Sequence, residues 1–464
     1  MPSETPPNDT RRHWWASLDG GARYHGFPLL TVLFAALTAY GTALFVLPFD
    51  LDNIVALSEG DRSQPFGFFR HAITWAYSDT GGSVPIYRPI GYVTIWAQEQ
   101  AGGLGAEQYF AFNLALWLGC ALALYALVHR LTRSRLAAAA AAAVLAVDSR
   151  ALNELIWIAE RQATLALLFG LLAVVAVVWW GDSPRRGLLA ATVLVLLSLS
   201  ALSKEYGIAF FVAVPLLAGL YRPRHWRAVT LAAVGAVAVY VVFRFGLAGG
   251  ATGAYCEDMG LWKRRHRVCY DALGLGDKLE QYFYNVGATL VGTVFPQFFN
   301  DIGIVRKPPA KELLEPLVVA GLAAVGAFRR PRAVLPLLSL VAGNAVLSFL
   351  VYRPRNQIIG MAGLYASAGV GLAVAAAFAA GRLQRREWRV AVPLAAAVLA
   401  FGWIGWHATH STGREVESYR SYVEGLNPCR YLRDFPKNVH ANIVFEIKRK
   451  YLLQDPNCTK TSPR

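Results

Sequence analysis

Long uncharged apolar runs alternate with short charged segments along most of this chain. A helix that spans a bilayer needs about 20 predominantly apolar residues. The first run, residues 27–49, is too long for a signal-peptide core and has no clear small-residue cleavage site, so we interpret it as an uncleaved helix. The pattern predicts an all-α polytopic membrane protein. Further runs that meet or approach the spanning length cover residues 109–128, 162–181, 187–203, 206–221, 228–243, 333–352 and 356–381.

Arginine clusters between the apolar runs orient the predicted helices. Cytoplasmic loops carry an excess of Lys and Arg, and all clusters fall on one side if the chain crosses in about eleven spans. The N-terminus is then cytoplasmic and the C-terminus extracytoplasmic. A full span at residues 281–300 would put the last clusters on the opposite side, so we predict a re-entrant or interfacial segment there. The clusters lie around Arg11, Arg130, Arg185, Arg222, Arg329 and Arg382.

This topology divides the chain into three parts. Residues 1–26 form a cytoplasmic tail, residues 27–406 the transmembrane domain and residues 407–464 a small extracytoplasmic tail. The transmembrane domain includes two large extracytoplasmic loops, 49–108 and 248–311. Within the first loop, segments 64–77 and 90–100 have the amphipathic pattern of helices that lie in the membrane interface.

Composition agrees with a lipid environment. Hydrophobic residues make up 55% of the chain and charged residues only 16%, against about a quarter in soluble domains. The net charge of +15 could indicate a nucleic-acid partner, but the basic residues sit in short clusters between apolar runs, as topology requires. We therefore expect a lipid bilayer and no nucleic acid. Arginine far outnumbers lysine and alanine is abundant, which suggests a GC-rich bacterial gene. We therefore expect the membrane to be a bacterial cytoplasmic membrane.

Four of the five cysteines fall in pairs on the predicted outer side. Cys256 and Cys269 share one extracytoplasmic loop, and Cys429 and Cys458 share the tail, whereas Cys120 lies in a helix. Disulfides persist in oxidising compartments. We predict two bridges, and the alternative is four free thiols paired by chance.

The first extracytoplasmic loop opens with two carboxylates, in Phe49-Asp50-Leu51-Asp52-Asn53. The same Asp-x-Asp triplet binds metal in many nucleotide-sugar transferases, but those need a soluble α/β domain. No glycine-rich loop follows a predicted strand and no P-loop is present, so nucleotide binding has no support. The plain alternative is that these carboxylates cap a helix or remain solvated.

Further charged and polar residues fall at predicted extracytoplasmic helix ends. Charges so close to a bilayer are costly and tend to be functional. Lys204 and Glu205 are the clearest case, because they occupy a very short connection between two apolar helices. The alternative for any one residue is interfacial snorkelling with a local ion pair. The whole set is Tyr87, Arg88, Glu160, Arg161, Lys204, Glu205, Arg353 and Arg355.

Cations and carboxylates at a membrane surface suit one chemistry in particular. Arg and Lys bind phosphate through charge-assisted hydrogen bonds, and a carboxylate can act as a general base. Together they fit the transfer of a group from a lipid-phosphate donor to a hydroxyl acceptor, with the cations stabilising the leaving phosphate. The donor-phosphate ligands would be Arg88, Arg161, Lys204, Arg353 and Arg355, with Tyr87, Glu160 and Glu205 beside them.

The ordered motifs resemble the GT-C glycosyltransferases, especially their protein O-mannosyltransferase-like and TMTC-like members. The resemblance covers about residues 27–222. It implies a polyprenyl-phosphate-linked sugar donor, inversion at the anomeric carbon, and an extracytoplasmic hydroxyl acceptor on a protein, a glycolipid or a polysaccharide. The motifs are Phe49-Asp50-Leu51-Asp52-Asn53, Tyr87-Arg88-Pro89-Ile90, Asn113, Trp157 with Arg161, and Leu202-Ser203-Lys204-Glu205.

One departure from the family pattern affects the catalytic residue. The usual adjacent acidic pair is split, so that Asp52 aligns with the first acidic position and Asn53 with the second. The family makes the first-loop Asp the base, so the resemblance assigns that role to Asp52, with Asp50 as the alternative. We assign no metal ligands and no cofactor; a divalent cation stays an open alternative.

Two other classes of protein compete with the enzyme. A transporter or flippase of lipid-linked sugars would show ionisable or Gly/Pro-broken segments near the bilayer midplane and paired halves. Here the helix centres are clean and the charges lie at the ends, which favours the enzyme. A catalytically inactive membrane scaffold stays open because the acidic pair is altered.

Overall fold

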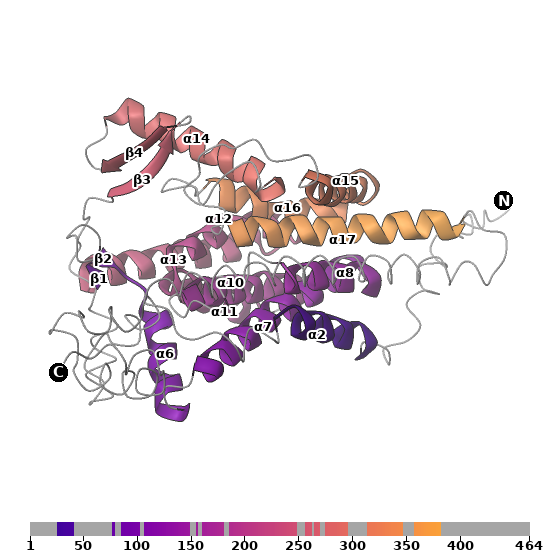
Figure 1. Cartoon of the computed structure of the whole chain (residues 1–464), viewed down its shortest axis with the longest axis horizontal. Helices are drawn as coiled ribbons and strands as arrows, with labels where there is room; N and C mark the ends of the chain where they lie inside the picture. Colours follow the sequence, from indigo (N-terminus) through magenta and orange to yellow (C-terminus); the bar gives the residue numbers. More distant parts are fainter. Residues whose placement is uncertain are drawn as a thin grey trace, which may run out of the picture.

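A computed structural model describes the chain in separate ranges and consists mainly of helices whose axes run broadly side by side (Figure 1). The described residues are 26–40, 77–78, 85–102, 106–148, 155, 160–180, 185–247, 256–261, 264–269, 274–295, 313–346 and 357–381. The helices are α2 (Gly26–Tyr40), α6 (Pro89–Gly102), α7 (Ala106–Thr132), α8 (Arg135–Ala146), α10 (Arg161–Trp180), α11 (Arg186–Ser203), the 3-10 helix η3 (Glu205–Ile208), α12 (Ala209–Tyr221), α13 (Trp226–Val241), the π-helix η4 (Val242–Leu247), α14 (Leu275–Val294), α15 (Leu314–Arg329), α16 (Pro331–Val346) and α17 (Ile358–Gly381).

Two short antiparallel hairpins accompany the helices. Strand β1 (Tyr77–Ser78) pairs with β2 (Pro85–Ile86), and β3 (Cys256–Leu261) pairs with β4 (Arg264–Cys269). The second register sets Cys256 opposite Cys269. The disulfide between them stays a prediction, and Cys429 and Cys458 lie outside the described residues.

The prediction of a membrane protein is supported by five helices in the described ranges that are long and apolar enough to cross a bilayer. The predicted total of about eleven spans goes beyond what these ranges establish. The five candidate spans are Gln108–Thr132, Arg161–Trp180, Arg186–Ser203, Trp226–Gly246 and Ile358–Ala380.

Small residues let the central helices approach closely. Helix α8 is a tract of buried alanines that packs against α7 and α17. A Cβ added at Gly369 of α17 would lie 2.5 Å from the carbonyl oxygen of Ala137, and one at Gly371 would lie 1.7 Å from that of Leu322. Such close contacts are the usual basis of helix association in membranes, where apolar side chains gain nothing by leaving lipid.

The candidate spans differ in how deeply they are buried. In α17, 83% of the span lies inside the bundle, whereas only 22% of the Trp226–Gly246 span does. Helix α13 therefore lies at the periphery, where Leu231 is 72% exposed and Val234 is 60% exposed. Large apolar side chains exposed along a candidate span are suited to contact with lipid.

Helix α6 differs from the other helices in direction. It runs across the bundle at one end, close to β1 and β2 (Figure 1), and packs against α10 and α11. Its first residue is Pro89, which suits the first turn of a helix because that position needs no N–H donor. Segment 90–100, predicted to lie in the interface, belongs to this crosswise helix; segment 64–77 lies outside the described residues except for Tyr77.

Helix α14 covers most of the segment predicted to be re-entrant or interfacial. It continues without a break through Val294, and residues 296–300 lie outside the described ranges. Its buried side chains are mostly polar. Gln281 donates to Asn285 at 2.8 Å, and Thr293 donates to Gln357 of the segment before α17 at 3.4 Å. The placement of α14 relative to the bilayer stays a prediction.

Asp148, after α8, joins helices from the two ends of the described chain. The hydroxyl of Tyr365 in α17 donates to its carboxylate Oδ2 at 2.6 Å. The hydroxyl of Tyr40 in α2 donates to the carbonyl oxygen of the same residue. These bonds hold the first and last described helices to one buried residue.

Candidate functional site

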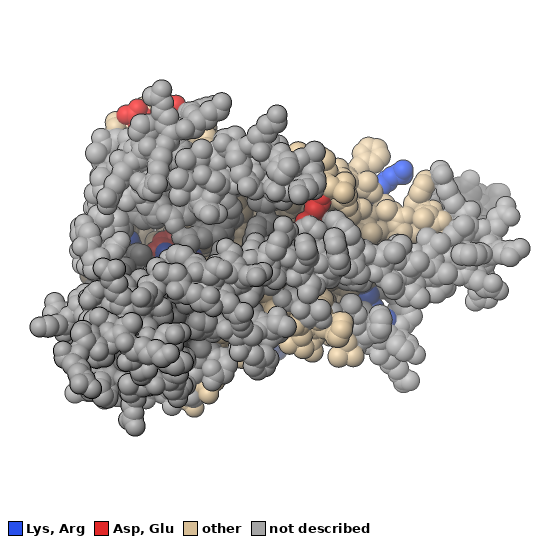
Figure 2. All heavy atoms as spheres, viewed as in Figure 1, with Lys and Arg blue, Asp and Glu red and all other residues tan. Residues whose placement is uncertain are grey.

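Four helix ends bring charged residues to the same end of the bundle. Helix α10 begins at Arg161 and α11 ends at Ser203, and the two helices pack together. Glu160 directly precedes α10, Lys204 directly follows α11, and Glu205 opens η3. Helix α6 starts beside them, one residue after Arg88. In Figure 2, acidic and basic atoms come close together at the left, the end where β1, β2 and α6 lie in Figure 1.

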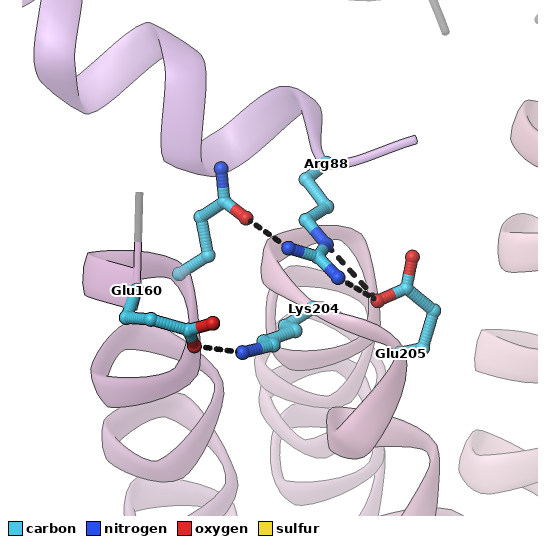
Figure 3. A network of polar contacts seen from close by, with 5 residues as sticks. Arg88, Glu160, Lys204 and Glu205 are labelled. Carbon is cyan, nitrogen blue, oxygen red and sulfur yellow. Dashed lines mark hydrogen bonds and ion pairs between the residues drawn. The ribbon is translucent and has the colours of Figure 1, made fainter. Parts of the chain in front are cut away.

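Two ion pairs cross this end of the bundle (Figure 3). The ammonium of Lys204 donates to Oε2 of Glu160, and these residues are only 1% and 6% exposed. The guanidinium of Arg88 contacts Oε2 of Glu205 through Nε and Nη2, each at 3.0 Å. The neighbours Lys204 and Glu205 thus find their partners on other elements, and Lys204 is buried rather than snorkelling to water.

Arg88 is held in its charged form. Burial by itself lowers the pKa of Arg88, but the carboxylates of Glu205 and Glu160 raise it, and the net shift is upward. Nη1 of Arg88 also donates to Oε1 of Gln162 at 2.8 Å. The two helices meet closely here, because a Cβ added at Gly91 of α6 would lie 2.2 Å from Cγ of Gln162.

Arg161 is a fully buried cation with neutral partners among the described residues. Its Nε donates to Oδ1 of Asn113 and its Nη2 to Oε1 of Gln98, both at 2.6 Å. The rings of Tyr109 and Phe112 lie 5.4 and 4.8 Å from the guanidinium carbon. Nη1 is buried and has no hydrogen-bond partner within the described ranges. Asn113 also donates to the carbonyl of Leu155 at 2.9 Å, so it fixes the position of Arg161.

A further cation, which the sequence did not single out, approaches the same residues. Arg244 lies in η4 at the end of α13, close enough to Glu205 and Tyr87 to interact with both electrostatically. We use "the charged cluster" for Arg88, Glu160, Arg161, Lys204, Glu205 and Arg244. It contains four cations and two carboxylates.

The structure thus brings together Tyr87, Arg88, Glu160, Arg161, Lys204 and Glu205 of the predicted site residues. The other members, Asp50, Asp52, Arg353 and Arg355, lie outside the described residues, as does Trp157. Their roles stay predictions. Within the described ranges, no group of three or more His, Cys, Asp or Glu side chains could hold a metal ion.

Sequence reasoning missed three partners of the site: Gln98, Gln162 and Arg244. The two glutamines are neutral side chains inside helices, and only Gln162, directly after Arg161, lies next to a charged motif that could have drawn attention. Arg244 follows directly after the predicted helix 228–243, and a single Arg at a helix end is ordinary. Only its electrostatic interaction with Tyr87 and Glu205 in the folded chain reveals it.

Comparisons with known proteins identify the fold. The sequence matches no protein-family model and no curated protein. Among solved structures, the apo crystal structure of the oligosaccharyltransferase of Archaeoglobus fulgidus matches with a TM-score of 0.50 and 14% identity, over 93% of this chain and 60% of that one. The oligosaccharyltransferase AglB of the same organism, in complex with an inhibitory peptide and a dolichol-phosphate, gives a TM-score of 0.49 and 14% identity, over 83% of this chain and 56% of that one.

The likeness defines a class of fold. Oligosaccharyltransferase AglB is a GT-C glycosyltransferase, and this chain has a fold of the GT-C type. The chain spans less than two thirds of the length of the structures it matches. At 14% identity the likeness gives no support to the narrower O-mannosyltransferase-like or TMTC-like branch.

Proposed function

We propose that this protein is a membrane glycosyltransferase that moves a sugar from a polyprenyl-phosphate-linked donor to an extracytoplasmic hydroxyl group on a protein, a glycolipid or a polysaccharide. The observation that carries the proposal is the charged cluster, buried at one end of an apolar helix bundle with a GT-C fold. Helix α11 runs from the Arg185 cluster, predicted to be cytoplasmic, to Lys204. The charged cluster then lies on the extracytoplasmic side of a bacterial cytoplasmic membrane.

The balance of charge in the cluster favours an anionic ligand. Four cations face two carboxylates, and the fully buried Arg161 has neutral partners among the described residues. A buried charge without a counter-ion is costly, so a bound phosphate would relieve it. A lipid-linked phosphate can reach this depth from the membrane, and the lipid delivers the activated sugar without any nucleotide site.

The proposed reaction exchanges one bond at the anomeric carbon. The carboxylate of Asp52 removes the proton of the acceptor hydroxyl, and the acceptor oxygen attacks the anomeric carbon from the side opposite the phosphate. The bond between this carbon and the phosphate oxygen breaks, the configuration inverts, and polyprenyl phosphate leaves with the electron pair. The cations stabilise the charge that develops on the leaving oxygen. Asp50 is the alternative base.

The ion pairs position the cations in this proposal. An ammonium has three N–H donors and a guanidinium five, so a carboxylate partner leaves donors for a phosphate. Glu160 and Glu205 fix the directions of Lys204 and Arg88, and Asn113 fixes that of Arg161. Arg353 and Arg355 complete the proposed donor site from the segment before α17.

The proposal is tested by transfer assays on the purified protein in liposomes that contain polyprenyl-phosphate sugars. Wild-type protein should release polyprenyl phosphate, and Asp52→Asn should lower the rate at least 100-fold while folding and membrane insertion are unchanged. Full activity in Asp52→Asn together with an inactive Asp50→Asn would move the base to Asp50. Activity in both variants would refute a first-loop base. Mass spectrometry of surface glycans in a deletion strain would identify the sugar and the acceptor.

A further inference from the structure

Two hydrogen-bond donors near the charged cluster have no partner in the described part of the chain. The hydroxyl of Tyr87 is buried without a hydrogen-bond partner, and the whole residue is 0% exposed. Nη1 of Arg244 is likewise buried without a partner, although the side chain as a whole is partly exposed. Buried donors are nearly always satisfied in folded proteins, so two unsatisfied ones in one place call for an acceptor.

The two groups are neighbours. Burial raises the pKa of Tyr87 to about 12, and the positive charge of Arg244 partly offsets that rise, which requires the two side chains to be close. Tyr240, one turn before Arg244, interacts electrostatically with Tyr87, Arg88 and Glu205 as well. The phenol is protonated at neutral pH, so the pair offers an O–H and a charged N–H. Both are donors, and together they suit an anionic oxygen ligand.

Arg244 is also the cation that a lipid can reach most directly. Exposed apolar side chains follow one face of α13 at intervals of three or four residues: Leu231, Val234, Val237 and Val241. The exposed apolar surface continues into the π-helical turn η4 with Val242 and Phe245, and the partly exposed Arg244 directly precedes Phe245. Single π-helical turns occur frequently at functional sites. A lipid that lies along this surface would bring its phosphate to the end of α13, beside Arg244.

The other cations of the charged cluster are less available. Arg88 and Lys204 are bound to Glu205 and Glu160, and Arg161 is 0% exposed. Among the described residues, Arg244 interacts electrostatically with Glu205 but does not form an ion pair with it. It is partly exposed on a helix of which only 22% is buried.

We infer that Arg244 and Tyr87 bind the phosphate of the lipid-linked donor, with the polyprenyl tail along the exposed face of α13. This inference rests on the proposed function. The donor phosphate is a diester with one negative charge, which one guanidinium can balance while the phenol donates to a second oxygen. Arg244 and Tyr87 are then additional ligands of the same phosphate, beside the more deeply buried Arg88, Lys204 and Arg161.

The test measures binding of polyprenyl monophosphate, without a sugar, to the purified protein by native mass spectrometry in detergent. Arg244→Gln should weaken binding at least 10-fold, because a charge-assisted hydrogen bond is lost. Tyr87→Phe should weaken it about 3-fold to 10-fold and leave the unfolding temperature of the ligand-free protein unchanged or higher, since it removes an unsatisfied hydroxyl. The matched control is Arg186→Gln at the opposite end of α11, which should bind as the wild type does.

Each outcome decides between the two proposals. If wild-type protein binds no polyprenyl phosphate, the proposed function fails. If wild type binds but Arg244→Gln and Tyr87→Phe bind equally well, only this inference fails; if Arg244→Gln does not fold, Tyr87→Phe decides alone. Inorganic phosphate or phosphatidylglycerol should not displace the ligand at equal concentration. Displacement by either would show a general anion or phospholipid site and would overturn the inference.

Discussion

Two of the cations in the candidate site are paired with particular carboxylates, Lys204 with Glu160 and Arg88 with Glu205. Lys204 and Glu160 come from different helix ends, and both are almost completely buried. Buried ion pairs contribute little net stability relative to apolar residues of the same shape, but removal of one member leaves a charge without compensation. The pair therefore links the ends of α10 and α11, and loss of either residue would leave a buried charge there that destabilises the fold.

At this residue scale, we predict that Lys204→Met lowers the free energy of unfolding by about 3–5 kcal/mol, because it leaves the Glu160 carboxylate buried without its ammonium partner. The double variant Lys204→Met/Glu160→Gln should recover most of this loss, since no net charge remains buried. Thermal unfolding of the purified proteins in detergent measures both. Equal destabilisation of the single and double variants would contradict the importance of the pair.

The sequence could identify charged residues but not their partners. Arg88, Lys204 and Glu205 stood out because charges next to apolar runs are rare. The pairing across elements could not be predicted, because Lys204 bonds to a residue 44 positions away rather than to its neighbour. Gln98 and Gln162 gave no signal, since a neutral amide in a helix becomes informative only when a guanidinium lies against it.

At the scale of elements, hydropathy placed the long helices to within a few residues. The predicted run 162–181 corresponds to α10 (Arg161–Trp180), and 187–203 to α11 (Arg186–Ser203). The hairpin of β3 and β4 was not predicted, because Arg264–Cys269 is too rich in charge to show a strand pattern. The direction of α6 depends on contacts with α10 and α11 that are far away in sequence.

The approach of α6 to α10 depends on Gly91. We predict that Gly91→Ala lowers the free energy of unfolding by about 1–3 kcal/mol and slows sugar transfer, because the new methyl group displaces Gln162 and breaks its hydrogen bond with Arg88. The control is Gly276→Ala in α14, where an added Cβ meets nothing within 4 Å. That variant should be neutral or slightly more stable. Thermal unfolding and the liposome transfer assay compare the two.

At the scale of the whole molecule, the proposed function requires the charged cluster to face the extracytoplasmic side of the membrane. Arg186 is exposed at the start of α11, and the charged cluster lies at the other end of the same helix. Gly276 is exposed near the start of α14, in the second predicted extracytoplasmic loop. The predicted topology places these two positions on opposite sides of the membrane.

We predict that, in a protein whose native cysteines are replaced by serine, Gly276→Cys reacts with a membrane-impermeant thiol reagent in intact cells and Arg186→Cys reacts only after the cells are opened. Labelling is read by gel shift. Native Cys429 should follow the pattern of Gly276→Cys when it is the only cysteine retained. The reverse pattern would place the charged cluster in the cytoplasm and refute the proposed orientation.

The bonds to Asp148 also set an order in which the bundle can be assembled. Tyr365 follows Asp148 by 217 residues. During synthesis, α8 therefore emerges long before α17. Tyr40 is already available at that point, but a chain that stops before α17 lacks the Tyr365 hydroxyl that donates to the carboxylate. The hydrogen bond between Asp148 and α17 therefore forms only after the last described helix has been synthesised. An isolated fragment that ends before α17 would therefore keep the Tyr40 bond and lose the Tyr365 bond at the same buried acid.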